Sequence, residues 1–330
     1  MRRGRSARAA AGINTFGYPL PMSSETRRIV GAGVAALLLT ACSAPAESAD
    51  DRVDVTVTTT HAADLVRAVG GEHVDVTALM GPGVDPHLYR ASQGDVRALA
   101  DADLVVYHGL FLEGRMEEVL EAGALERVVA LTEALPTEEF ITSIDYPDQY
   151  DPHVWFDPEL WVQVVPPLVA ELSALAPEHA EDFAAGGQEY VAQALAAHAE
   201  ATALLDAVPE HARLLVTSHD AFGYFGRAYG LEVRGVQGLS TEDEAGVADI
   251  RRLVDLLVER EVPALFTESS VSPASITAVR EAAADRGWTV HVPEEGLYSD
   301  ALGEPGTPAG TYAGMLLANA ELVARALGAQ

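Results

Sequence analysis

Residues 177–208 read PEHAEDFAAGGQEYVAQALAAHAEATALLDAV, and this stretch without a strand signal divides the strand-like runs of the chain into two sets. It begins with Pro177, a favoured first helical residue, and is rich in alanine, glutamate and leucine. We predict one long helix here, about 45 Å from end to end. Gly186 and Gly187 count against an unbroken helix, because glycine destabilises the interior of a helix. The alternative to a helix that links two lobes is an ordinary surface helix inside one domain.

Short β-branched runs alternate with amphipathic segments on both sides of this stretch. The first set is VDVTVTTT (53–60), HVDVTALM (73–80), DLVVYH (103–108) and ERVVAL (126–131). The second set is RLLVTS (213–218), LEVRGV (231–236), PALFTE (263–268) and WTVHV (288–292). Strands that alternate with helices favour parallel sheets with right-handed crossovers. We therefore predict an α/β fold with two lobes, each a mostly parallel β-sheet flanked by helices: an N-terminal lobe over 53–176, the linking helix over 177–208 and a C-terminal lobe over 209–330.

The first 41 residues are typical of an export signal. Arg27 and Arg28 precede an apolar run at 29–41, which is too short for a membrane span and suits a signal peptide. Cys42 follows small residues in the manner of bacterial lipoproteins, so we expect lipid on Cys42 and a flexible tether over 42–52. The true start is either Met1 or Met22. The alternative is an ordinary signal peptide that happens to contain a cysteine.

Composition excludes some classes of protein and of site. The formal net charge of −29 argues against a nucleic-acid binder, which would show a basic face. The chain has one cysteine, so we expect neither an internal disulfide nor a thiolate metal cluster.

The tripeptide Asp-Pro-His occurs twice, in GVDPHLYRASQGDV (83–96) and in QYDPHVWFDPEL (149–160). The proline ring fixes the local φ, which limits the freedom of the loops that carry His87 and His153. Asp85 and Asp151 stand two residues before these histidines. Each could accept a ring N–H and fix the tautomer, as carboxylates do beside metal-binding histidines.

His219 shares a placement with His87 and His153. It follows RLLVTS directly, and all three lie after predicted strands, where open α/β sheets bind ligands. We expect three imidazoles in one cleft, and three unrelated loop histidines are the alternative. For the other histidines considered we expect surface or packing roles: His73, His179, His198, His211 and His291.

Asp300, in GLYSDALGEPGTPAGTY (296–312), is the candidate fourth ligand. Three imidazoles and one carboxylate suit a borderline divalent ion such as zinc, cobalt or manganese. Asp300 could instead cap a helix that starts near Ala301. Glu268 ends the run PALFTE and is a spare ligand or, as we prefer, a group that orients a ligand.

Five blocks of sequence resemble the substrate-binding proteins of zinc and manganese ABC importers, the cluster A-I family, and most closely the TroA type. The blocks occur in family order: LMGPGVDPHLY (79–89), ADLVVYHGLFLEGRM (102–116), DPHVWFDPELW (151–161), VTSHDAFGYFGRAYGLEVRGVQGLSTEDEA (216–245) and LYSDALGEPGTPAGTYAGM (297–315). The likeness covers residues 53–327. It implies that the metal ligands of the family fall on His87, His153, His219 and Asp300, at the interface of two lobes joined by a rigid backbone helix.

The resemblance also implies a function. The implied function is that of a receptor and not of an enzyme. The resemblance also implies that lipid anchors this receptor on the extracytoplasmic face of the cell membrane. The receptor captures one divalent ion, Mn²⁺ or Zn²⁺, as cargo and delivers it to an ABC permease with its ATPase. We expect a monomer. Neutral imidazoles with an ordinary pKa would make affinity fall below about pH 6.

Two departures from the family leave the metal open between manganese, zinc and iron. The loop EALPTEEFITSIDYPDQY (133–150) lacks the histidine-rich insertion of many zinc receptors, and His219 stands where some manganese receptors have glutamate.

Two other functions stay open. One is a metal-dependent surface adhesin. The other is a zinc hydrolase, which the sequence disfavours because it has no His-Glu-x-x-His helix and Asp300 would close the fourth coordination position.

Overall fold

We describe residues 52–120, 125–143, 149–242 and 245–329 of a computed structural model, which lie within one compact unit spanning residues 47–330. The predicted signal peptide, Cys42 and all of the tether except Arg52 lie outside the described residues. Among the described residues, no helix is both long enough and apolar enough to cross a membrane.

The first sheet is entirely parallel, with strand order β2-β1-β3-β4. Its strands are β1 (Val53–Val57), β2 (Val74–Ala78), β3 (Leu104–Tyr107) and β4 (Val128–Ala130), which confirms the four runs predicted there. The helices that connect them are α1 (Thr60–Gly70), α2 (Gln93–Asp101) and the short α3 (Glu117–Leu120). Ser92 begins α2 with a capping box that pairs it with Asp95.

The second sheet pairs β5 (Leu214–Thr217) with β6 (Glu232–Gly235) in parallel, with α7 (Gly223–Tyr229) between them. The other two runs expected as strands do not form strands: residues 263–268 pair only through isolated parallel bridges, Ala264 to His291 in the last run and Glu268 to Leu297 beyond it. Pro263 and Pro293 flank these bridges and have no N–H to donate, which keeps a longer ladder from forming. Two further helices, α8 (Val247–Glu259) and α9 (Ala274–Asp285), share an apolar core with this sheet.

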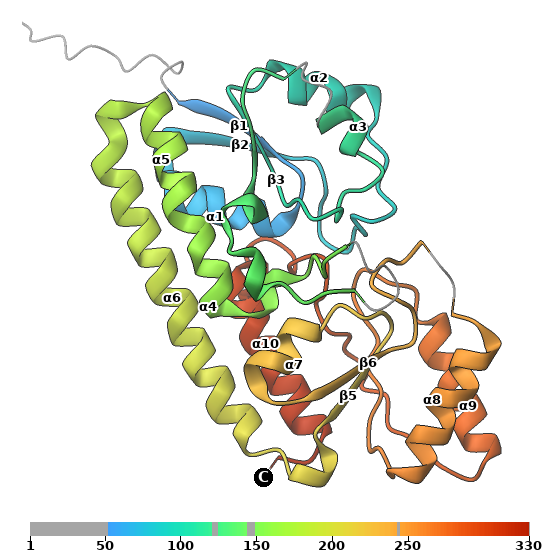
Figure 1. The fold of residues 1–330 in the computed structure, drawn as a ribbon. Helices are drawn as coiled ribbons and strands as arrows, with labels where there is room; N and C mark the ends of the chain where they lie inside the picture. The colour runs from blue at the N-terminus through green and yellow to red at the C-terminus, as the bar shows by residue number, and fades with distance from the viewer. Residues whose placement is uncertain (1–51, 121–124, 144–148, 243–244, 330) are drawn as a thin grey trace, which may run out of the picture. The chain divides into compact units, whose positions relative to one another are not determined.

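The predicted linking helix is present as α6 (Ala180–Asp206), whose 27 residues span about 40 Å. It starts later than predicted because Pro177–His179 form a 3₁₀ turn. Figure 1 shows α6 running alongside α5 (Val165–Leu175), and it also packs against α1 and α10 (Tyr312–Ala326). Gly186 does not break the helix. A Cβ there would lie 2.6 Å from the carbonyl oxygen of Val69, so glycine lets α6 approach α1 closely.

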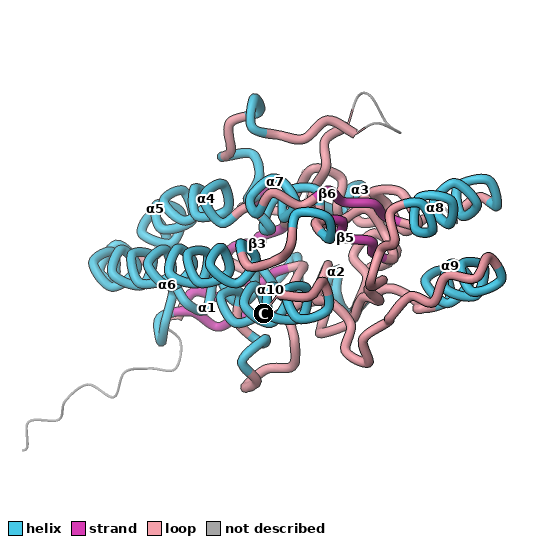
Figure 2. The backbone as a smooth tube through the Cα atoms, turned by 90° about the horizontal axis from the view of Figure 1, so that it is seen from below, coloured by secondary structure: helices cyan, strands magenta, loops and turns pink. Residues whose placement is uncertain are grey.

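One apolar core runs through both α/β lobes. It includes Val55 of β1, Phe183 of α6, Phe225 of α7 and Leu316 of α10, all fully or almost fully buried. In the view of Figure 2, α8 and α9 lie at the end opposite α5 and α6. These features confirm the predicted α/β class with two lobes joined by a long helix. The exact lobe boundaries, 53–176 and 209–330, stay a prediction.

Candidate metal centre

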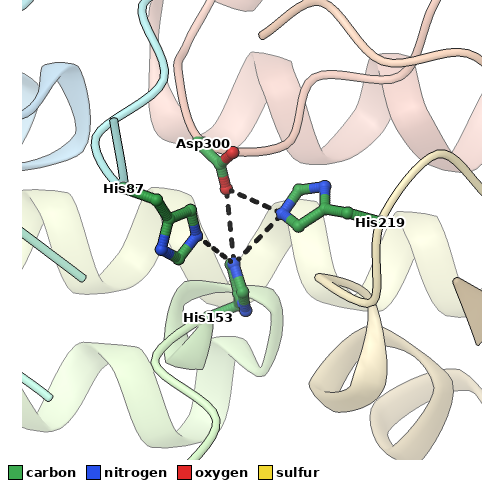
Figure 3. Close-up of side chains that lie close together, drawn as sticks. All are labelled: His87, His153, His219 and Asp300. Atoms are coloured by element: carbon green, nitrogen blue, oxygen red, sulfur yellow. Dashed lines mark hydrogen bonds and ion pairs between the residues drawn. The ribbon is translucent and has the colours of Figure 1, made fainter. Parts of the chain in front are cut away.

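The three histidines and Asp300 converge, as Figure 3 shows. His153 Nε2 lies 3.4 Å from His87 Nε2 and 3.3 Å from His219 Nε2. Asp300 Oδ1 lies 3.4 Å from Nε2 of both His153 and His219. All four side chains are buried, and their donor atoms all lie within 4.8 Å of one another. The alternative of three unrelated loop histidines is therefore wrong.

Each of these residues comes from a different loop. His87 and His219 follow β2 and β5, and His153 begins a 3₁₀ turn that leads into α4 (Pro158–Trp161). Asp300 lies in the loop before α10. No helix starts at Ala301, so the alternative of Asp300 as a helix cap is wrong.

Carboxylates hold two of the imidazoles in one orientation. Asp151 Oδ1 accepts hydrogen bonds from the backbone N–H of His153 at 2.9 Å and from its ring Nδ1 at 2.7 Å. Glu268 does the same for His219, at 2.8 Å from the backbone nitrogen and 2.5 Å from Nδ1. Because an ionised carboxylate can only accept, both Nδ1 atoms carry a proton, and both Nε2 atoms face the cluster, where each can donate a lone pair to an ion once it has lost its own proton.

Asp85 differs from this pattern. Its carboxylate accepts the backbone N–H of His87 at 2.9 Å, but its other oxygen accepts the hydroxyl of Thr241 at 2.5 Å. The expectation that Asp85 fixes the ring tautomer of His87 is therefore wrong. The Asp85 carboxylate instead links the loop that carries His87 to the loop after β6, because Thr241 in that second loop donates its hydroxyl to Asp85.

The two carboxylate oxygens of Asp300 have different surroundings. Ser270 donates its hydroxyl to Oδ2 at 3.2 Å. Oδ1 is buried and accepts no hydrogen bond of good geometry from any described residue, but it lies 3.4 Å from Nε2 of His153 and of His219, which pair with it when they are protonated. A buried carboxylate oxygen of this kind costs free energy unless a cation faces it.

The spacing of the donors fits a tetrahedral ion. Four of the six distances between donor atoms are 3.3–3.4 Å, and the other two, from His87 to His219 and from His87 to Asp300, are no more than 4.8 Å. A regular tetrahedron with edges of about 3.35 Å has its centre about 2.05 Å from each corner, the usual length of a bond from Zn²⁺ to nitrogen or carboxylate oxygen. His153, His219 and Asp300 therefore match three corners of such a tetrahedron, and His87 lies close enough to supply the fourth.

The charges of the cluster shift its pKa values in opposite directions. Burial lowers the pKa of His87 to about 3. Burial also acts to lower the pKa of His153, but Asp151 and Asp300 outweigh it and raise that pKa to about 9. In the same way, Glu268 and Asp300 raise the pKa of His219 well above its usual value. Against the effect of burial, His219 and His153 hold the pKa of Asp300 well below its usual range.

It follows that His153 and His219 hold protons at neutral pH when no metal is bound. A divalent ion has to displace these protons. We therefore expect the affinity for the metal to decrease as the pH drops below about 9, and not only below about 6, the limit expected from an ordinary histidine pKa.

Trp155 contributes to the site in a way that sequence reasoning missed. Its indole N–H donates to the carbonyl oxygen of Ser299 at 3.2 Å, which ties the His153 segment to the Asp300 loop. Its ring lies edge-on to His153 at 5.3 Å and stacks on the buried His61 at 4.5 Å. The only sign of this role in the sequence was that Trp155 lies in DPHVWFDPELW (151–161), one of the blocks that resemble the family.

Comparisons with known proteins show the family of the chain. A profile of the family described as "Zinc-uptake complex component A periplasmic" matches residues 55–326. The manganese-binding lipoprotein MntA of Bacillus subtilis (strain 168) is 46% identical over 296 residues, which cover 89% of this chain and 96% of MntA. The zinc-binding protein TroA of Treponema pallidum (strain Nichols) is 41% identical over 281 residues, which cover 85% of this chain and 90% of TroA.

Solved structures give the same result. The structure of TroA from Treponema pallidum matches with a TM-score of 0.81 and 40% identity, covering 84% of this chain and 99% of that one. The laminin binding protein Lmb of Streptococcus agalactiae, described as having adhesin and metal transporting activity, matches with a TM-score of 0.72 and 26% identity. That match covers 84% of this chain and 100% of Lmb. The chain belongs to the family of periplasmic A components of zinc-uptake complexes.

Proposed function

We propose that the protein is an extracytoplasmic receptor that captures one Mn²⁺ or Zn²⁺ ion as cargo and delivers it to an ABC permease. The observation that carries this proposal is the convergence of four buried donor atoms from four separate loops, all within 4.8 Å of one another. His87, His153, His219 and Asp300 are the ligands in this proposal. Asp151 and Glu268 orient two of the imidazoles through their Nδ1 atoms.

The ion enters and leaves on the side of His87. His87 is 5% exposed, whereas His153 and His219 are 0% exposed and Asp300 is 2% exposed. A cavity of ≈ 250 Å³ reaches His87 and is lined by residues from both lobes, Arg115 and Glu242 among them. These two side chains form an ion pair at 2.5 Å. Because one apolar core runs through both lobes, we expect release through local movement of the loops rather than through wide opening.

The partners follow from the family. We propose that the receptor is a monomer that docks on a permease with its ATPase, and that lipid on Cys42 holds it at the membrane. Support comes from the name of MntA, a lipoprotein, and from the apolar run that precedes Cys42.

Transport is favoured over catalysis by the burial of the centre. A zinc hydrolase needs a coordination position open to substrate. Here four protein donors lie within 4.8 Å of one another and can fill all four positions of a tetrahedral ion. An adhesin is the second candidate, and the likeness to Lmb is the one observation that favours it. Loss of metal uptake with intact surface adhesion, after deletion of the gene, would separate the two roles.

We propose that zinc binds more tightly than manganese, whichever ion is the physiological cargo. Sites of nitrogen and oxygen donors generally bind zinc more tightly than manganese, and the spacing among His153, His219 and Asp300 favours a short tetrahedral bond. Competition between the two ions at pH 7.5, followed by metal analysis of the protein, tests this ranking. Retention of manganese in the presence of equal zinc would overturn it.

A further inference from the structure

A single segment, residues 268–270, contacts two of the proposed ligands. Glu268 accepts hydrogen bonds from the backbone N–H and the ring Nδ1 of His219. Ser270, two residues later, donates its hydroxyl to Oδ2 of Asp300 at 3.2 Å. The backbone N–H of Asp300 points back to the hydroxyl oxygen of Ser270 at 3.5 Å. The Ser270 hydroxyl therefore contacts both the side chain and the backbone of Asp300.

Backbone hydrogen bonds fix this segment against the loop that carries Asp300. The N–H of Leu297 donates to the carbonyl oxygen of Thr267, and the N–H of Ser269 donates to the carbonyl oxygen of Leu297, both at 2.8 Å. Because these bonds join main chain to main chain, they hold Ser270 beside Asp300 whatever side chain stands at position 270. The hydroxyl can therefore be removed without displacing either loop.

The hydroxyl of Ser270 is itself oriented by Ser299. Ser299 is fully buried, and its hydroxyl oxygen lies 2.8 Å from that of Ser270. Each serine hydroxyl has one hydrogen to donate. Since Ser270 donates its hydrogen to Asp300, the bond between the two hydroxyls is donated by Ser299. The hydrogen bonds therefore run in one direction, from Ser299 through Ser270 to the carboxylate, and bonds in such a chain strengthen one another.

The bond from Ser270 decides which way the Asp300 carboxylate faces. Oδ1 lies 3.4 Å from Nε2 of His153 and of His219, and Figure 3 shows the other carboxylate oxygen turned away from the imidazoles. The torsion that turns a carboxylate has a broad energy profile, so the side chain alone does not fix this orientation. Without a bond to Oδ2 the carboxylate is free to turn, and a metal ion has to arrest that motion when it binds. The Ser270 hydroxyl arrests it before the ion arrives.

We propose that Ser270 is a positioning residue of the metal centre, which holds the Asp300 carboxylate in the orientation that presents Oδ1 to the ion. The inference rests on the proposed function, because it takes Asp300 to be a ligand. The segment 268–270 then orients two ligands from two different loops, His219 through Glu268 and Asp300 through Ser270. A movement of this one segment would loosen two of the four donors together.

Chelator competition and the visible spectrum of bound Co²⁺ test the proposal on the full chain, purified in detergent and stripped of metal. Ser270→Ala should lose about tenfold in zinc affinity, the lower end of the range for groups that hold metal ligands. The absorption bands of Co²⁺ depend on the arrangement of its donor atoms, so they should shift in Ser270→Ala. Ser270→Thr keeps the hydroxyl and should restore both the affinity and the spectrum. Ser275→Ala is the matched control, because the hydroxyl of Ser275 in α9 has no hydrogen-bond partner among the described residues.

Two further positions separate the possible outcomes. Ser299→Ala should weaken zinc binding less than Ser270→Ala does, and the double variant should bind no more weakly than Ser270→Ala alone, because Ser299 acts through Ser270. His153→Ala should abolish tight binding, and unchanged binding there would contradict the proposed function and this inference with it. If His153→Ala loses tight binding while Ser270→Ala keeps the affinity and the Co²⁺ spectrum of the unmodified chain, the positioning role is wrong and the proposed function stands. A Ser270→Thr variant that binds zinc no better than Ser270→Ala would overturn the positioning role as well.

Discussion

Replacing Glu268 by Gln removes one negative charge from behind a proposed ligand and leaves the shape of the side chain almost unchanged. Glu268 Oε2 accepts the Nδ1–H of His219 at 2.5 Å, and Oε1 accepts the backbone N–H of the same residue at 2.8 Å. The glutamine can keep one of these bonds. It cannot supply the charge that makes the His219 imidazole a stronger donor to a metal ion.

The expected loss in zinc affinity is about 10–100-fold, or about 1.4–2.8 kcal/mol, as for other hydrogen-bond partners of metal ligands. The charge of Glu268 also overcomes the effect of burial and raises the pKa of His219. In the variant, protons therefore compete less with the metal. We expect the affinity deficit to be largest near pH 9 and to shrink as the pH falls toward 6.

Competition with a chelator of known zinc affinity measures this effect across the pH range. Glu281→Gln, on the exposed face of α9, is the matched control and should bind zinc as the unmodified chain does. Thermal unfolding of the metal-free variants checks that both fold. Equal affinity of Glu268→Gln and the unmodified chain at pH 9, or a deficit that grows as the pH falls, would refute the role given to Glu268.

Three further predictions follow from the anchor, the ligands and their protons. Cys42→Ser should release the protein from membranes into the soluble fraction, and equal partitioning of variant and unmodified chain would contradict the lipid anchor. His87→Ala, His153→Ala and His219→Ala should each weaken zinc binding by more than about 100-fold in chelator competition, since even the loss of a ligand's hydrogen-bond partner costs about 10–100-fold. His198→Ala should leave it unchanged. Because the pKa of His153 is about 9 without metal, zinc affinity should rise between pH 6 and 9 by about tenfold per unit for each proton displaced. Calorimetry in buffers of different ionisation enthalpy counts these protons, and an affinity that is flat above pH 6.5 would contradict the assignment.

Much of the fold and of the candidate site was predictable because both depend on local sequence. The β-branched runs of the first sheet each formed a strand, and Pro86 and Pro152 marked the two loops that carry histidines to the centre. His219 was placed by the strand immediately before it. In each case, residues only a few positions away along the chain fix where the histidine side chain lies.

What could not be predicted depends on contacts between distant segments. Asp85 bonds to Thr241, which lies 156 residues further along the chain, and nothing near Asp85 indicates that partner. The stacking of the His73 ring on the His179 ring depends on the close approach of two helices at Gly186, a residue that read as a weak point of the helix. The raised pKa of His153 arises from the neighbouring Asp151 and also from Asp300, and only the second of these is far away in sequence.

The most direct test of the proposed receptor is a crystal structure of the zinc-loaded protein with anomalous scattering measured at the zinc absorption edge. We predict the strongest peak among His87, His153, His219 and Asp300, about 2.0–2.2 Å from each of the four donor atoms, with no water in the coordination shell. A strongest peak elsewhere, or an ion at this centre with an open position filled by water, would contradict the proposal of a closed site that carries its ion as cargo.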